Sequence, residues 1–324
     1  MAVGNAVEKL RENVKDRINN ATAEMSNVLV IGLTGSGKSS LINSIEQSVV
    51  GKPANLARVG RGVGENVTLC IEGCDMFSTL GDNLRDKVKF WDFVGLPNRD
   101  DEAIRTLISL ALDGRIPENQ PLTNPEYFEM CKEELEDEFP VIPDGPKIQR
   151  VVVVCAADEE IPTNLLKATK KAAQPATTAA DRNIPLFLFI SKVDKMVGEA
   201  NAEGLSRRIH KARDTLDATN YFFEKATLYH EQTNAVNDPG MASNDSTDES
   251  LLRFLFNILN PTLRLVYAKP RPEPILGDLR RANRRKYIRT KRWVRKNLCP
   301  LWIAEAILLG LVAIVIAIVY LNRK

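Results

Sequence analysis

The sequence predicts an α/β fold, a mostly parallel sheet with helices on both faces, followed by a C-terminal transmembrane helix. Three observations predict this fold. Short runs of apolar, often β-branched residues alternate along the chain with segments of helical periodicity. A glycine-rich stretch connects the first of these runs to a helix. The segment 301–321 is almost wholly apolar, and as a helix rising about 1.5 Å per residue it is long enough to span a bilayer.

The composition excludes several other classes of protein. Hydrophobic residues make up 44% of the chain and charged residues 27%, which is typical of a globular protein and not of a disordered, collagen-like or polytopic membrane protein. The five cysteines show no paired spacing, and with two histidines they form no zinc motif, so we expect reduced thiols in a reducing compartment. The first twenty residues are charged throughout and do not resemble a secretory signal.

The expected elements follow in chain order. Segment 1–24 predicts an amphipathic helix, because apolar residues recur there at helical spacing: Val7, Leu10, Val14 and Ile18. A single domain is expected at 25–262. Its expected strands lie at 27–31, 67–71, 88–93, 151–156, 185–190 and 226–229, and its expected helices at 38–50, 101–112, 165–173, 202–216 and 250–259. A capping box of Ser246 and Glu249 is expected to open the last helix. Segment 113–147, acidic and rich in proline, is expected to be an insertion or a lid.

Residues 32–39 read GLTGSGKS, the spacing of a phosphate-binding P-loop. Glycines let the backbone bend so that its N–H groups point at a phosphate, and the following helix aims its positive dipole end at the same anion. Lys38 would reach the β- and γ-phosphates, and the Ser39 hydroxyl would hold Mg²⁺. The expected nucleotide contacts are Gly32, Thr34, Gly35, Ser36, Gly37, Lys38, Ser39 and Ser40. The alternative is a purely structural glycine-rich turn.

Three further residues are expected around the triphosphate. Asp92 ends the strand 88–93 and is expected to hold the Mg²⁺ shell, although an aspartate there could also be a cap. Gly95 would offer its N–H to the γ-phosphate, and Thr68 could close over Mg²⁺ or be an ordinary β-forming residue. The expected catalytic residues are Lys38, Thr68 and Gly95. The expected metal ligands are Ser39, Thr68 and Asp92.

Residues 191–194 read SKVD and indicate which base is bound. Guanine presents a ring N–H beside an amine, so the carboxylate of Asp194 could accept both hydrogen bonds, whereas adenine has no such pair of donors. Lys192 would lay its alkyl stem over the purine, or else be a solvated loop lysine. Thr233 is the candidate for the last guanine contact. These residues predict GTP/GDP with Mg²⁺ as ligands, and an ATP-using P-loop protein is the alternative.

With GLTGSGKS, DFVG at 92–95 and SKVD in this order, the sequence resembles the guanine-nucleotide-binding (TRAFAC-like) branch of the P-loop GTPases over residues 25–235. The stretches WDFVGLPN and LDGRIPEN are similar to the interferon-induced 44-type GTP-binding proteins, and more distantly to the immunity-associated nucleotide-binding GTPases. The resemblance implies a GTPase-type sheet, Mg²⁺·GTP as ligand and a role in immune or membrane biology.

Two departures from that family pattern carry expectations. The guanine motif usually begins with Asn or Thr, so the smaller Ser191 predicts weaker bracing of the loop. Leu96 stands where many GTPases carry a glutamine that orients the attacking water, which predicts slow intrinsic hydrolysis. Arg58 or Arg61 could neutralise developing charge in cis or across a dimer, although a solvated loop arginine is the simpler interpretation.

The C-terminal part is expected to anchor the protein to a membrane. Ten basic residues and no acidic one lie between Arg280 and Lys296, within the linker 263–300, and the apolar segment 301–321 follows with Trp302 and Tyr320 near its ends. This pattern predicts a tail anchor that leaves the N-terminal domain in the cytosol, on the mitochondrial outer membrane, the peroxisome or the endoplasmic reticulum. Adjacency to the span makes anionic lipid a better partner for the basic run than nucleic acid.

Two functions fit these features. The first is a slow GTPase switch in which segment 51–65 and the segment after Gly95 respond to the γ-phosphate. The second is a GTP-bound membrane tether or scaffold with little or no hydrolysis. A nucleotide-dependent homodimer and protein effectors are the further expected partners.

Overall fold

The structure is a computed structural model of the whole chain. It describes residues 2–20, 27–59, 70–81, 84, 87–122, 125–143, 145–175, 182–196, 199–218, 222–229, 245–263 and 290. The chain divides into two compact units, Met1–Lys269 and Pro270–Lys324. All described residues except Thr290 belong to the first unit.

A six-stranded sheet forms the centre of this first unit, in the order β2-β3-β1-β4-β5-β6. The strands are β1 (Asn27–Gly32), β2 (Glu72–Asp75), β3 (Lys89–Asp92), β4 (Arg150–Ala156), β5 (Leu186–Ser191) and β6 (Phe223–Lys225). Every neighbouring pair is parallel except β2 with β3. Because β1 lies between β3 and β4, the loop that follows β1 leaves the sheet at its topological switch point, where open α/β sheets bind ligands.

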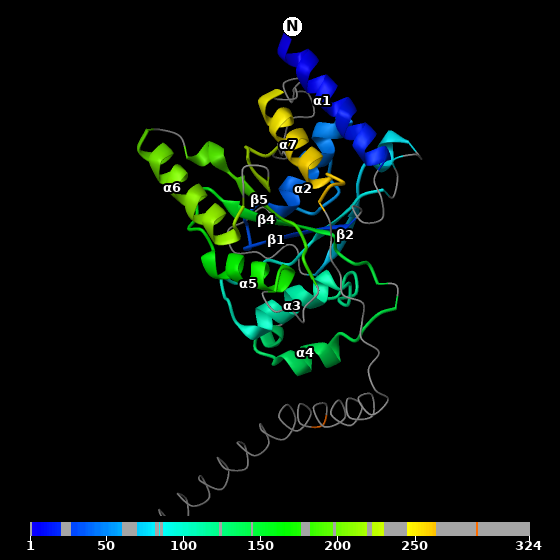
Figure 1. Cartoon of the computed structure of the whole chain (residues 1–324), viewed down its shortest axis with the longest axis vertical. Helices are drawn as coiled ribbons and strands as arrows, with labels where there is room; N and C mark the ends of the chain where they lie inside the picture. Colours follow the sequence, from blue (N-terminus) through cyan, green and yellow to red (C-terminus); the bar gives the residue numbers. More distant parts are fainter. Residues whose placement is uncertain are drawn as a thin grey trace, which may run out of the picture. The chain divides into compact units, whose positions relative to one another are not determined.

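Helices cover both faces of the sheet (Figure 1). The α-helices are α1 (Ala2–Asn19), α2 (Lys38–Val50), α3 (Glu102–Leu112), α4 (Lys132–Glu138), α5 (Thr163–Ala173), α6 (Glu199–Leu216) and α7 (Asp245–Ile258). Short 3₁₀ turns occur at η2 (Ser78–Leu80), η3 (Pro125–Phe128) and η4 (Val193–Lys195). Helices α1, α2 and α7 pack on one face, whereas α3, α5 and α6 pack on the other.

The side chains of the central strands alternate between two hydrophobic cores. In β1, Leu29 and Ile31 join the core under α3 and α5, whereas Val28 and Val30 join the core under α1, α2 and α7. The strands β4 and β5 show the same alternation and are buried along their whole length. Strands buried on both faces read as continuous apolar runs, which is why the sequence identified these three. The predicted α/β fold with a mostly parallel sheet is confirmed.

Two predicted strands are misplaced. The last strand is Phe223–Lys225 and not 226–229, where Ala226 and Leu228 are buried without belonging to a strand. In the predicted strand 67–71, Cys70 forms only an isolated bridge with Pro121, Ile71 lies in no strand, and residues 67–69 lie outside the described residues. The edge strand itself is β2, which runs antiparallel to β3.

The described part of α7 begins at Asp245, so Ser246, the predicted N-cap, has helical conformation. Asp245 and Asp248 occupy the first turn of α7, where carboxylates complement the positive end of the helix dipole.

The insertion 113–147 packs onto the domain through its own short helix, α4. Leu135 and Phe139 are buried in the core beneath α3. The Arg115 guanidinium donates hydrogen bonds to the backbone oxygens of Glu136 (2.8 Å) and Phe139 (2.7 Å), which fastens the end of α4.

Within the part of the chain that the structure describes, no helix has the length and apolar character needed to cross a membrane. The predicted span 301–321 and all of the basic run 280–296 except Thr290 lie outside the described residues.

Candidate nucleotide-binding site

The loop between β1 and α2 has the backbone conformation of a phosphate loop. Gly35 (φ +74°) and Gly37 (φ +92°) adopt the left-handed conformation, which residues with a side chain rarely adopt. Gly37 is the N-cap of α2, and it offers no side-chain oxygen to the first helical N–H groups. The start of α2 therefore keeps the free N–H groups and positive dipole end that bind phosphate.

The segment after β3 lies directly against this loop. A Cβ atom added to Gly95 would lie 2.7 Å from Thr34 Cα and 2.8 Å from Thr34 N, so the close approach requires glycine. The Leu96 N–H donates to the Gly32 oxygen at 3.2 Å. Gly95 is thus next to the phosphate loop as predicted, whereas the side chain of Leu96 is buried in the core. Leu96 therefore supplies neither a polar group nor a water-orienting side chain.

Lys38 folds back over its own loop. Its ammonium Nζ donates to the oxygens of Leu33 (3.0 Å) and Gly32 (3.5 Å), and only 5% of the residue is exposed. Burial lowers the pKa of Lys38, and the nearby charge of Asp92 opposes that shift. A buried cation held by carbonyl oxygens fits a site that receives an anion, because phosphate oxygens would supply the missing negative charge.

Ser39 and Asp92 meet beneath the loop. The Ser39 hydroxyl donates to Asp92 Oδ2 at 2.5 Å, and Asp92 is 1% exposed at the end of β3. The parallel register that aligns Val30 with Asp92 brings the carboxylate to the first turn of α2. A hydroxyl and a carboxylate are the hard oxygen ligands that Mg²⁺ prefers, so these two residues fit the metal that the sequence predicts.

Ser36 adds a further polar group within the loop. Its hydroxyl is buried and has no hydrogen-bond partner among the described residues. A buried hydroxyl without a partner costs free energy, and a phosphate oxygen could accept its hydrogen bond. Among the described residues, the loop thus contains an unsatisfied donor as well as a buried cation.

Ser191 connects the end of β5 to the phosphate loop. Its hydroxyl is fully buried and donates to the Ser36 oxygen at 2.6 Å. A Cβ atom added to Gly37 would lie 3.3 Å from Ser191 Cβ, so the two segments are in contact. This close packing brings the short serine side chain within hydrogen-bond distance of the loop, and the weaker bracing expected for serine stays a prediction.

Lys192 and Asp194 follow Ser191 on the same turn. Lys192 adopts a left-handed conformation (φ +55°), and its Nζ lies 3.5 Å from Glu159 Oε1 and 3.7 Å from Asp158 Oδ1. Asp194 is exposed in η4, immediately after the bracing serine. The hydrogen bond from Ser191 to Ser36 therefore joins the segments SKVD and GLTGSGKS, although the two residues are 155 positions apart in the sequence.

Burial raises the pKa of Asp158, but the hydrogen bond from Lys195 and the charge of Lys192 outweigh it, so the pKa is lowered. This carboxylate is held ionised beside the predicted base site. Lys192 is thus an ion-paired loop residue.

Two predicted site residues lie outside the described residues, Thr68 and Thr233, as does Arg61. Ser40 is half-buried in the first turn of α2, and Thr34 is exposed in the loop.

Asn43 of α2 holds residues 56 and 57 of segment 51–65, a contact that the sequence did not predict. The Asn43 amide oxygen accepts the N–H groups of Leu56 (2.8 Å) and Ala57 (2.9 Å).

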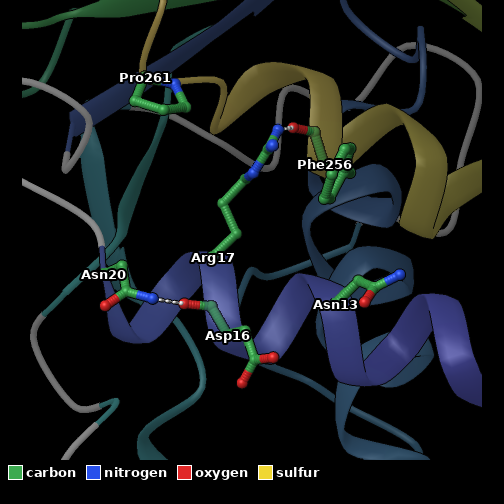
Figure 2. A pocket seen from close by; sticks show the side chains of 6 residues that line it. All are labelled: Asn13, Asp16, Arg17, Asn20, Phe256 and Pro261. Carbon is green, nitrogen blue, oxygen red and sulfur yellow. Dashed lines mark hydrogen bonds between the residues drawn. The ribbon is translucent and has the colours of Figure 1, made fainter.

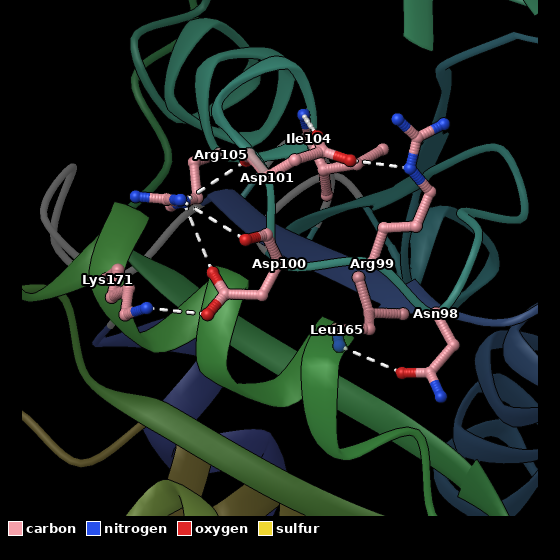
Figure 3. A network of polar contacts seen from close by, with 8 residues as sticks. All are labelled: Asn98, Arg99, Asp100, Asp101, Ile104, Arg105, Leu165 and Lys171. Carbon is pink, nitrogen blue, oxygen red and sulfur yellow. Dashed lines mark hydrogen bonds and ion pairs between the residues drawn. The ribbon is translucent and has the colours of Figure 1, made fainter.

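The segment after Gly95 is joined to α3 and α5 (Figure 3). The Asn98 side-chain oxygen accepts the N–H groups of Asn164 and Leu165, each at 3.1 Å, and so caps α5. Asp100 pairs with Lys171 of α5 (2.5 Å) and with Arg105 of α3 (3.2 Å). The role of Asn98 was not predicted from the sequence, although Pro162 immediately before the helix was a signal, because proline has no side-chain oxygen for a cap.

A separate pocket lies along α1 near the C-terminal end of α7 (Figure 2). Its lining residues are Asn13, Asp16, Arg17, Asn20, Phe256 and Pro261. None of them belongs to the phosphate loop, to β3 or to SKVD, so this pocket is distinct from the predicted nucleotide site.

The strand order, the loop after β1, the carboxylate ending β3 and the SKVD turn after β5 thus lie together at the topological switch point of a mostly parallel α/β sheet, in the arrangement that the sequence motifs predict. No known protein-family profile matches the chain, and no curated protein matches its sequence.

Two proteins with solved structures of similar fold are Toc33 and SelB. Toc33 from Arabidopsis thaliana matches in two structures. The dimerization-deficient mutant has 12% identity and a TM-score of 0.44, and the complex with GDP and Mg²⁺ has 14% identity and a TM-score of 0.41. Each match covers 83% of this chain and 96% of the Toc33 chain. Translation elongation factor SelB from Methanococcus maripaludis, in complex with the GTP analogue GppNHp, matches with 15% identity and TM-score 0.33 over 62% of this chain and 29% of that one. Because these values are low, the likeness adds nothing to what the chain's own geometry shows.

Proposed function

We propose that this chain is a membrane-anchored guanine-nucleotide-binding protein that hydrolyses GTP slowly and acts as a nucleotide-dependent switch on a cytosol-facing membrane. The hydrogen bond from Ser191 to the phosphate loop carries the proposal, because it brings the predicted base-reading turn and the predicted phosphate site together. The apolar segment 301–321 and its basic flank support the anchor. The stretches WDFVGLPN and LDGRIPEN favour the interferon-induced 44-type branch of GTPases.

Binding follows from the residues of the site. Backbone N–H groups of the loop and the Lys38 ammonium would bind the β- and γ-phosphates, and Asp194 would accept hydrogen bonds from guanine. Mg²⁺, held by Ser39 and Asp92, would neutralise phosphate charge when bound. Lys192 would exchange its contacts with Asp158 and Glu159 for the face of the purine.

Hydrolysis would proceed by in-line attack of water on the γ-phosphorus, with GDP as the leaving group. Lys38 and the loop N–H groups would stabilise the charge that develops on the phosphate oxygens. Leu96 is 2% exposed and apolar, so it orients no water, and the reaction is expected to be slow.

The test is nucleotide binding by the full-length chain in detergent, with GTP, GDP and ATP each titrated in the presence and absence of Mg²⁺. We expect binding of GTP and GDP, tighter GTP binding with Mg²⁺ and no competition by ATP. Equal competition by ATP would favour the alternative of an ATP-using protein, and absence of guanine-nucleotide binding would contradict the proposal.

A GTP-bound tether or scaffold with little or no hydrolysis is the second candidate, and the burial of Leu96 favours it. Single-turnover hydrolysis of labelled GTP at low and high protein concentration separates the two. Phosphate release that rises with concentration would support a switch and a nucleotide-dependent homodimer, whereas no release at either concentration would support the tether.

A further inference from the structure

We propose that Arg11 of the N-terminal helix, acting through the buried carboxylate of Asp248, positions Leu228 and Tyr229 against the phosphate loop, and thereby sets the lifetime of the bound nucleotide. The inference rests on the proposed nucleotide-binding function and adds to it a set of positioning residues: Arg11, Asp248 and Tyr229. None of them is part of the nucleotide motifs.

The segment Leu228–Tyr229 lies directly on the nucleotide site. A Cβ atom added to Gly37 would lie 3.4 Å from Leu228 Cδ1, so this leucine packs against the last glycine of the phosphate loop. The Tyr229 N–H donates to the hydroxyl of Ser44 at 3.0 Å, and Ser44 is fully buried two turns into α2. The segment therefore packs against both the phosphate loop and the helix that follows it.

The Tyr229 ring is held from the other end by α7. Its hydroxyl donates to Asp248 Oδ1 at 2.7 Å, and Asp248 is only 1% exposed. The second carboxylate oxygen, Oδ2, accepts a hydrogen bond from Arg11 at 3.0 Å. One buried carboxylate thus joins α1 to the segment that contacts the phosphate loop.

Arg11 is itself anchored at the far end of α2, where its Nε donates to the Ser48 oxygen at 2.8 Å. A buried carboxylate without its arginine would be an uncompensated charge, so loss of Arg11 would favour rearrangement around Asp248. The first group to respond would be the Tyr229 hydroxyl, because it shares the same carboxylate.

The hydrogen-bond network of Arg11, Asp248 and Tyr229 leads to the phosphate loop, which distinguishes it from an ordinary packing contact between helices. Its last member, Tyr229, directly follows Leu228, whose side chain contacts the last glycine of the phosphate loop. A shift of Tyr229 would therefore act on the Leu228 contact with Gly37. The expected consequence is faster nucleotide release, with the chemistry of hydrolysis unchanged.

A second arginine of α1 provides a matched control. Arg17 stacks over the Phe256 ring at 3.4 Å from its centroid and donates to the Phe256 oxygen at 2.7 Å, so it also ties α1 to α7 (Figure 2). Neither of these two contacts leads to Tyr229. Losing Arg17 tests docking of α1 in general, whereas losing Arg11 tests the path through Asp248.

The experiment measures the dissociation rate of a fluorescent GTP analogue from the full-length chain in detergent, together with thermal stability. Tyr229→Phe removes only the hydroxyl, Asp248→Asn removes the charge, and Arg11→Met keeps an apolar side chain. We expect each to raise the dissociation rate about tenfold, which corresponds to about 1.4 kcal/mol. The double variant Arg11→Met with Asp248→Asn should be no faster than either alone, because both act through one path. Arg17→Met should lower thermal stability without changing the rate.

Three results would overturn the inference. One is a dissociation rate within twofold of wild type in both Tyr229→Phe and Asp248→Asn. The second is an equal acceleration in Arg17→Met, since that would assign the effect to helix docking as a whole. The third is a wild-type chain that binds no guanine nucleotide, which would contradict the proposed function as well, whereas the first two leave that function standing.

Discussion

Ser191 shows how one side chain can join two distant motifs. Serine stands where the family motif usually has the larger Asn or Thr, and its hydroxyl donates to the Ser36 oxygen at 2.6 Å. The carbonyl that accepts this bond belongs to the loop 32–39, so the hydrogen bond fixes the relative position of the predicted base-reading turn and the predicted phosphate site.

Replacing Ser191 should therefore affect binding as well as folding. Ser191→Ala leaves a buried backbone oxygen with one partner fewer, so we expect the free energy of unfolding to fall by about 1 to 2 kcal/mol and GTP to dissociate about tenfold faster. Urea unfolding and stopped-flow release of a fluorescent GTP analogue measure the two effects. Ser191→Thr keeps the hydroxyl and should behave like wild type in release. If Ser191→Ala releases GTP at the wild-type rate, the bracing role is wrong.

Helix α2 contacts the loop after β2 through a buried carboxyl group. Glu46 of α2 is 3% exposed, and its Oε2 accepts the Phe77 N–H at 2.8 Å. Burial raises the pKa of Glu46 above its usual 4.5, and the hydrogen bond from Phe77 opposes the shift. Because the folded pKa is the higher one, this group stabilises the protein fully below its unfolded pKa and loses that contribution as the pH rises through the folded pKa.

Glu46→Gln keeps the acceptor oxygen and removes the ionisation. We expect the variant to be more stable than wild type at pH 7, with the difference disappearing as the pH falls below the unfolded pKa of 4.5. Unfolding by urea at a series of pH values measures this. A stability difference that is the same at pH 7 and pH 4 would show that the effect is one of packing and not of charge.

Helix α5 depends on a cap supplied from the segment after Gly95. Asn98→Ala removes the oxygen that accepts the Asn164 and Leu165 N–H groups, so we expect the free energy of unfolding to fall by about 1 kcal/mol. Asn98→Asp retains an acceptor and should keep most of that stability, as measured by thermal or urea unfolding. A loss in Asn98→Asp as large as in Asn98→Ala would contradict the capping role.

The parts that the sequence predicted well are those whose signal is local. The strands β1, β4 and β5 are buried on both faces and read as unbroken apolar runs, and the phosphate loop is a contiguous motif. The edge strands β2 and β6 were misplaced because they are short and carry charged residues, such as Glu72 and Lys225.

The contacts that complete the site depend on residues far apart in the chain. The Ser191 hydrogen bond spans 155 positions and that of Tyr229 with Ser44 spans 185, and no local pattern marks either one. Sequence periodicity identifies which face of an element is buried, but not which side chain on another element it will meet.

At the scale of the whole molecule, charge and apolar character are separated along the chain, with an acidic body preceding a basic run and the segment 301–321. If that segment inserts into lipid, the full-length chain should remain on anionic liposomes in about 1 M salt, where the Debye length is only about 3 Å. A chain ending at residue 300 keeps the basic run, so it should bind at low salt and be released at high salt. Liposome flotation measures both, and salt-induced release of the full-length chain would contradict insertion.

The central claim is that Asp194 selects the guanine base of a nucleotide whose phosphates lie in the loop 32–39. Calorimetry of Asp194→Asn with GTP and with xanthosine triphosphate tests it most directly, because xanthine carries a carbonyl where guanine carries the amine and an asparagine amide can donate to it. We predict that wild type prefers GTP, and that the variant loses about 100-fold or more in GTP affinity while gaining affinity for xanthosine triphosphate. Unchanged GTP affinity in Asp194→Asn, with no gain for the xanthine nucleotide, would contradict the account.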